Sequence, residues 1–169
     1  YVPAPYSIYR GIHKLLPGHS LALGWQSREP VLKQYWSARR IAEHGYSHPL
    51  VQSEDAIRST LDALLRDAIG KQMLADVPLG AFLSGGIDSS TVVALMQAQS
   101  SRPVKTFTIG FEEEGYNEAV HAAAIARHLG TDHTELYVTP REAMDVIPKL
   151  HTIYDEPFAD SSQIPTYLL

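Results

Sequence analysis

The sequence predicts an α/β protein with a parallel sheet and helices on both faces, preceded by a short β-rich piece of another domain. From residue 53 onward, stretches with apolar residues at helical spacing alternate with short apolar runs. Before residue 50 the chain is rich in turn residues and has only short strand-like runs. The change of pattern predicts two domains, one over residues 1–50 and one over residues 51–169.

Little helical structure is expected in the first 52 residues. A helical turn is expected between Ile8 and Leu16, followed by a turn at Pro17-Gly18. Two strands are expected at 19–23 and 31–36, joined by a loop. Residues 37–52 are polar and are interrupted by Gly45 and Pro49, so we expect a linker there.

The rest of the chain predicts strands that alternate with helices. Ser53 can cap a helix whose apolar residues from Ile57 to Ile69 share one face. Strands are then expected at 79–83, 104–111 and 135–138, and helices at 89–98, 117–129 and 140–153. Such alternation implies parallel βαβ units over residues 53–138, in which ligands bind at the carboxyl ends of the strands.

Composition excludes several kinds of partner. The 169 residues are 44% hydrophobic and 20% charged, as in soluble globular proteins. A net charge of −5 with scattered acids argues against a nucleic-acid partner. No apolar run approaches the roughly 20 residues that span a membrane, so no membrane partner is expected. The absence of cysteine excludes a disulfide framework and a thiolate zinc site, and fits a cytoplasmic location.

Seven residues, Ser84-Gly85-Gly86-Ile87-Asp88-Ser89-Ser90, form the most informative motif. They stand between an expected strand and an expected helix. Glycines let a backbone approach an anion closely, and the amides at a helix N-terminus point at a bound phosphate. The serines add donors, whereas Asp88 would repel phosphate unless a cation such as Mg²⁺ lies between them. The motif therefore predicts a phosphate site with Asp88 as a metal ligand.

The motif has alternative interpretations. No Gly-x-x-x-x-Gly-Lys-Ser/Thr and no Gly-x-Gly-x-x-Gly occurs, so neither common nucleotide motif is present. A serine-rich turn with Asp88 or Ser89 as a helix N-cap is the alternative. Because an apolar strand leads into both glycines, the acid and the serines, we favour the phosphate site.

Three further groups of polar residues are candidate sites. Asp155, Glu156 and Asp160 form an acidic cluster that can bind Mg²⁺ or adjust a substrate's protonation, or can be a solvated turn in which Asp160 caps a helix. The acidic run 112–114 is expected to be a solvated loop. His121 and His128 lie seven residues apart with no third ligand nearby, so we favour structural roles for them.

The motif resembles the pyrophosphate-binding PP-loop of ATP pyrophosphatases, and its surroundings resemble one family of that superfamily. That family is the glutamine-dependent asparagine synthetases, and the resemblance covers nearly the whole chain. It implies an adenine nucleotide alpha hydrolase-like fold for residues 51–169. It also implies that residues 1–50 are the tail of a glutaminase domain of the N-terminal nucleophile type, plus a linker. The similar segments are Ile12–His19, Asp76–Ser90, Phe107–Phe111, Ala126–His133 and Asp155–Ser162.

The resemblance also implies a function. ATP and Mg²⁺ would adenylate the side chain of aspartate with release of pyrophosphate, and ammonia from glutamine would then give asparagine. Phe82 and Ile109 match strand-end positions that contact adenine, although sheet core is the alternative for their side chains, and Gly110 ends the same strand as Ile109. The phosphates would contact Ser84, Gly85, Gly86, Ile87, Asp88, Ser89 and Ser90. No catalytic residue is assigned.

The family pattern is incomplete in this stretch. It has no cysteine to act as the glutaminase nucleophile and lacks the family's second acidic loop. We therefore expect this stretch to be an excised segment of a larger enzyme and to be inactive by itself. A homodimer is one expected arrangement of the parent enzyme. A related amidotransferase or a β-lactam synthetase-like enzyme that adenylates another carboxylate is an alternative. A non-catalytic nucleotide-binding module is a third.

Overall fold

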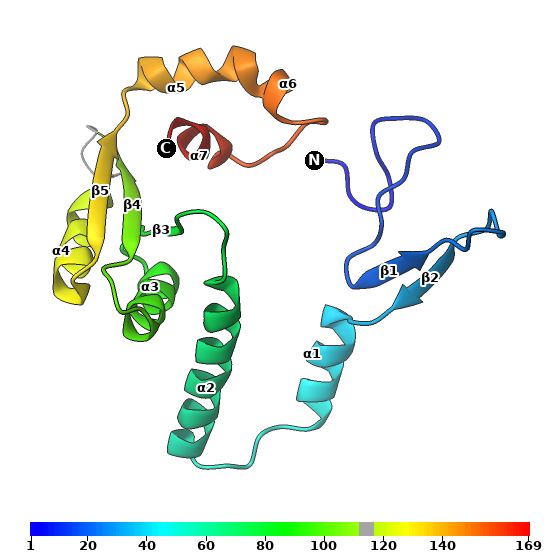
Figure 1. Cartoon of the computed structure of the whole chain (residues 1–169), viewed down its shortest axis with the longest axis horizontal. Helices are drawn as coiled ribbons and strands as arrows, with labels where there is room; N and C mark the ends of the chain where they lie inside the picture. The colour runs from blue at the N-terminus through cyan, green and yellow to red at the C-terminus, as the bar shows by residue number, and fades with distance from the viewer. Residues whose placement is uncertain (112–116) are drawn as a thin grey trace. The chain divides into compact units, whose positions relative to one another are not determined.

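The computed structural model describes residues 1–111 and 117–169 (Figure 1). The chain forms two compact units, one of Tyr1–Gln52 with Leu150–Asp160, the other of Ser53–Lys149 with Ser161–Leu169. The assignment of residues 1–50 to a glutaminase domain stays a prediction. The acidic run 112–114, expected as a solvated loop, lies outside the described residues.

The first unit contains a small antiparallel sheet. Its strands are β1 (His19–Ala22) and β2 (Val31–Gln34), so both predicted strands are present. Between residues 8 and 16, where a helical turn was expected, the Ile12 N–H donates to Tyr9 O and no helix follows.

The segment expected as a linker contains the helix α1 (Ala38–Ser47). Ser37 caps this helix by accepting a hydrogen bond from the Arg40 N–H at 3.3 Å. The composition concealed the helix because no residue of α1 is buried and Gly45 lies in its last turn, where a glycine disturbs few intrahelical hydrogen bonds.

The second unit is the predicted α/β layer. Its three strands form one parallel sheet in the order β3-β4-β5, flanked by helices, which confirms the predicted fold class (Figure 1). Ser53 caps the first helix as expected. The elements in chain order are α2 (Glu54–Gln72), β3 (Gly80–Phe82), α3 (Ile87–Gln99), β4 (Lys105–Gly110), α4 (Ala119–Leu129) and β5 (Asp132–Tyr137).

The remaining helices follow β5. The expected helical stretch 140–153 is divided into three pieces. A short further helix, α7 (Gln163–Leu168), was expected only in the alternative in which Asp160 caps a helix, and its N-cap is Ser162 instead. Pro165 lies in the first turn of α7, where its missing N–H costs no intrahelical bond. The three pieces are α5 (Pro140–Val146), the 3₁₀ helix η1 (Ile147–Lys149) and α6 (Leu150–Ile153).

The core of the second unit lies between the sheet and two helices. Leu83, directly after β3, and Val93 of α3 pack with Ala122 and Ala126 of α4, and all four are buried. The small alanine side chains let α4 approach closely. This packing holds the β3–α3 corner, which carries the sequence motif, in a defined position.

Candidate functional site

The motif forms the corner between β3 and α3. β3 ends at Phe82, and the buried Leu83 donates its N–H to Phe107 O at 2.8 Å. Ser84 and Gly85 make the turn, Gly86 is the helix N-cap, and Ile87 to Ser90 form the first turn of α3. The motif therefore lies at the carboxyl end of a parallel strand, as predicted.

The first amides of α3 have no side-chain cap. Gly86 occupies the N-cap position and offers no side chain, so the alternative in which Asp88 or Ser89 caps the helix is wrong. Both residues lie inside the helix instead. An uncapped helix N-terminus carries N–H groups and a positive partial charge, which favour an anion.

The serine hydroxyls surround this N-terminus. The Ser84 and Ser89 Oγ atoms lie 3.0 Å apart, and the Ser84 N–H donates to Ser89 Oγ at 3.3 Å. Ser90 Oγ donates to Gly86 O at 2.6 Å. The longer of these bonds are weak, so Ser84 and Ser89 can turn their hydroxyls toward a bound oxyanion at small cost.

Gly85 is the position at which the corner needs a glycine. Its φ is +83°, in the left-handed region, and a Cβ there would lie 3.0 Å from His121 Cβ and 3.1 Å from Ala122 N. The turn thus packs directly on the first turns of α4. At Gly86 the nearest contact of a Cβ would be 3.4 Å, so sterics there are mild.

The predicted adenine-contact residues lie on the same edge of the sheet. Phe82 ends β3, and Ile109 and Gly110 end the neighbouring strand β4. Phe82 is 59% exposed, so the sheet-core alternative does not hold for its side chain, whereas Ile109 is half-buried. A Cβ at Gly110 would lie 2.6 Å from the Tyr137 ring and 3.1 Å from Ala119 Cβ, so this position also requires a glycine.

Asp88 is the acid of this site. It lies exposed in the first turn of α3. Among the described residues, no three His, Cys, Asp or Glu side chains lie close enough together to hold a metal ion. This holds for the surroundings of His121 and His128 as well. A lone carboxylate nevertheless fits Mg²⁺, which commonly retains waters and binds one or two carboxylates together with substrate phosphates.

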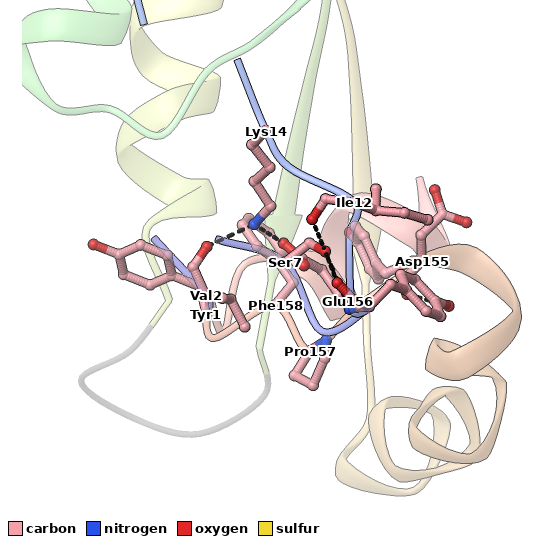
Figure 2. A pocket seen from close by; sticks show the side chains of 11 residues that line it. Tyr1, Val2, Ser7, Ile12, Lys14, Asp155, Glu156, Pro157 and Phe158 are labelled. Atoms are coloured by element: carbon pink, nitrogen blue, oxygen red, sulfur yellow. Dashed lines mark hydrogen bonds and ion pairs between the residues drawn. The ribbon is translucent and has the colours of Figure 1, made fainter. Parts of the chain in front are cut away.

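The acidic cluster of residues 155–160 lies in the other unit. Glu156 pairs with Lys14, and Asp155 O accepts a hydrogen bond from Tyr9 Oη at 3.3 Å. These contacts border a pocket of about 690 Å³ (Figure 2). The contacts of Lys14 and Tyr9 could not be predicted, because no local pattern signals contacts that span more than 140 residues.

Comparison with known proteins gives consistent matches. A family model described as asparagine synthase matches residues 60–169. Asparagine synthetase 1 of Bacillus subtilis, a glutamine-hydrolyzing enzyme by its name, is 32% identical over the whole chain. Two proteins named "Putative asparagine synthetase", also glutamine-hydrolyzing by name, are 35% identical over 100% of the chain (Mycobacterium tuberculosis) and 38% identical over 99% (Methanocaldococcus jannaschii).

The chain spans about a quarter to a third of the length of these relatives. It covers 25% of the B. subtilis and M. tuberculosis proteins and 31% of the M. jannaschii protein. The match begins with the first residues and continues past the motif, so both units have counterparts in the relatives.

Proposed function

Because the chain belongs to the asparagine synthase family, we propose that the protein of which it forms part makes asparagine from aspartate with ATP and Mg²⁺. The aspartate side chain is adenylated with release of pyrophosphate, and ammonia from glutamine then displaces AMP. The observation that supports this proposal is the β3–α3 corner, where two glycines, three serines and Asp88 surround an uncapped helix N-terminus.

Different groups of the β3–α3 corner bind different parts of Mg²⁺-ATP in this proposal. The amides of the first turn of α3 and the hydroxyls of Ser84 and Ser89 donate to the β- and γ-phosphates, and Ser90 joins them by exchanging its bond to Gly86 O for one to phosphate. Asp88 binds Mg²⁺, which neutralises phosphate charge. When the carboxylate oxygen attacks the α-phosphorus, negative charge grows on the leaving pyrophosphate, and donors already oriented toward it stabilise that charge.

The adenine lies farther along the same edge in this proposal. Phe82 offers an exposed aromatic face at the end of β3. Ile109 offers backbone groups near the end of β4, and Gly110 ends the same strand, where the Tyr137 ring packs against it. Because the reaction uses ATP, the proposal also assigns the protein to the cytoplasm. No helix among the described residues is long and apolar enough to cross a membrane.

The test is Asp88→Asn in the full-length protein. The substitution keeps size and hydrogen bonding but removes the charge that attracts Mg²⁺, so pyrophosphate release should be abolished while glutamate release from glutamine persists. Ser84→Ala deletes one donor among several and should slow pyrophosphate release by about tenfold or more, since a hydrogen bond to a charged group contributes about 1.5–3 kcal/mol. Both products are measured in the same reaction.

The matched control is Asp132→Asn. Asp132 is an exposed aspartate at the start of β5, at the opposite end of the same sheet. The Asp132→Asn variant should release pyrophosphate at the parent rate. Pyrophosphate release by Asp88→Asn at the parent rate would overturn the proposal. Supplying carboxylates other than aspartate to the parent protein tests the choice of substrate.

A further inference from the structure

The Lys14–Glu156 ion pair differs in kind from the other ion pairs found among the described residues. Lys14 Nζ pairs with Glu156 Oε1 across 142 positions of sequence, with the two side chains only 34% and 23% exposed. Four other ion pairs among the described residues each lie within one helix, three or four residues apart, and their side chains are 43–91% exposed. Exposed pairs of that kind contribute little, whereas a sheltered pair with further hydrogen bonds holds its partners in place.

Lys14 is held on its other side by the N-terminal segment. Its Nζ donates to Val2 O at 2.6 Å, and its backbone N–H donates to Pro5 O at 2.9 Å. The ammonium group therefore lies between a carbonyl and a carboxylate (Figure 2). Lys14 therefore connects Glu156 to the N-terminal segment of the chain.

Further contacts fasten the same loop. Tyr9 Oη donates to Asp155 O at 3.3 Å, one residue before Glu156. Tyr154 and Phe158 lie in sequence on either side of Asp155 and Glu156, and their rings contact each other with centroids 5.1 Å apart. All five residues line the pocket shown in Figure 2.

The loop that contains Glu156 belongs to a different unit from the residues on either side of it. Leu150–Asp160 belongs to the unit of the first 52 residues, although Lys149 before it and Ser161 after it belong to the other unit. The chain thus leaves the unit that contains the phosphate corner, contacts the N-terminal segment and returns. Asp155 and Asp160, the remaining acids of the cluster, are carried on this excursion.

We propose that the Lys14–Glu156 pair is a strap that positions the acidic loop 155–160 for the amide-forming reaction, with Lys14 and Glu156 as positioning residues. The proposal rests on the proposed function. Glu156 has a positioning role in it, because its Oε1 pairs with the lysine ammonium. The strap makes the amide-forming reaction depend on the N-terminal segment, so its loss should uncouple glutamine hydrolysis from amide formation.

The experiment compares Lys14→Met, Glu156→Gln and the double variant in the full-length protein. Limited chymotrypsin cleavage after Tyr154 and Phe158, followed by mass, reports loop release without any ATP chemistry. Each single variant should be cut about five- to tenfold faster than the parent, because cleavage follows the population of the open loop. The double variant should be cut no faster than either single variant, since one interaction is lost in all three.

The second readout is the ratio of glutamate released to asparagine formed. Both single variants should raise it severalfold through a lower kcat for asparagine, with the KM for glutamine unchanged. Lys14→Arg retains a cation and should restore most of the parent ratio. The controls are Lys33→Met and Glu29→Gln, which remove exposed charges in the same unit and should change neither readout.

Several results would overturn the proposal. These are unchanged cleavage after Tyr154 and Phe158, additive effects in the double variant, or faster cleavage with a parent product ratio. Failure of the proposed function has a different signature, namely pyrophosphate release by Asp88→Asn at the parent rate, whatever the Lys14 variants do to cleavage.

Discussion

At the scale of single residues, Gly85 connects backbone geometry to the candidate site. Its positive φ is a conformation that L-residues adopt at a cost, and α4 occupies the space in which a side chain would lie. Gly130 also has a positive φ, of +70°, but no atom lies within 4 Å of its missing Cβ. The two glycines thus separate the cost of conformation from the cost of contact.

Gly85→Ala should therefore destabilise the protein more than Gly130→Ala does. The conformational part is about 1–2 kcal/mol for each, and only Gly85→Ala adds the collision with His121 and Ala122. Urea unfolding measures the two free energies, and Gly85→Ala should also impair pyrophosphate release whereas Gly130→Ala should not. Equal destabilisation by the two variants would contradict the close packing of the corner on α4.

Glu142 is the residue with a clear pH signature. It completes a capping box at the start of α5, in which the Thr139 N–H and hydroxyl both donate to Glu142 Oε2 at 2.8 Å. These two hydrogen bonds, the backbone one first, lower the pKa of the Glu142 carboxyl below its ordinary value. A carboxyl whose pKa is lower in the folded state stabilises the fold only while it is ionised.

The stability difference between the parent and Glu142→Gln should therefore depend on pH. It should be constant above the ordinary glutamate pKa of about 4.3 and should shrink as the pH falls through the lower pKa of the folded state. Thermal unfolding between neutral and acidic pH measures it, and the parallel variant Glu29→Gln at an exposed position corrects for general charge effects. A difference that stays the same at all pH values would show that the charge of Glu142 contributes nothing.

At the scale of elements, α3 shows how packing chooses among similar side chains. Val92 and Val93 are neighbours in one apolar stretch, yet Val93 is fully buried in the core and Val92 is 42% exposed. The apolar residues of α3 are not confined to one face, so their spacing does not tell which of them face the sheet. The contacts with α4 and with Leu83 make that choice.

Val93→Ala should cost about 2 kcal/mol of unfolding free energy, because two buried methyl groups are removed and a cavity remains. Val92→Ala should cost well under half as much, since that side chain is partly in water already. Denaturant unfolding monitored by circular dichroism compares the two variants. A larger loss for Val92→Ala would contradict the orientation of α3 on the sheet.

At the scale of the whole molecule, the chain changes unit between Gln52 and Ser53. Residues 48–53 link α1 to α2, lie outside any helix or strand and are all exposed. They are easier to unfold locally than α1, which occupies most of the region expected as a linker. Proteases should therefore recognise this short link first.

Limited thermolysis should cut the chain first beside Leu50 and Val51, which are 70% and 95% exposed. Replacing both by aspartate removes the preferred side chains and should slow this cut without altering later ones. The masses of the first two fragments identify the bond. A first cut within residues 79–138 would contradict the boundary.

The local pattern of the sequence determined the alternation of strands and helices from Ser53 to Tyr137 and the position of the motif at the end of a strand. Both follow from apolar spacing and from Gly, Ser and Asp residues whose preferences act within a few positions. The helix α1 was hidden because all its side chains face solvent.

Tertiary structure alone decided three further features: that Gly85 must be a glycine, that Phe82 is exposed, and that Glu156 contacts Lys14. Each depends on residues distant in sequence, His121 for the first and Lys14 for the last. Spacing along the chain carries information about neighbours on one helix or strand, whereas the distance between remote residues is set only when the elements pack.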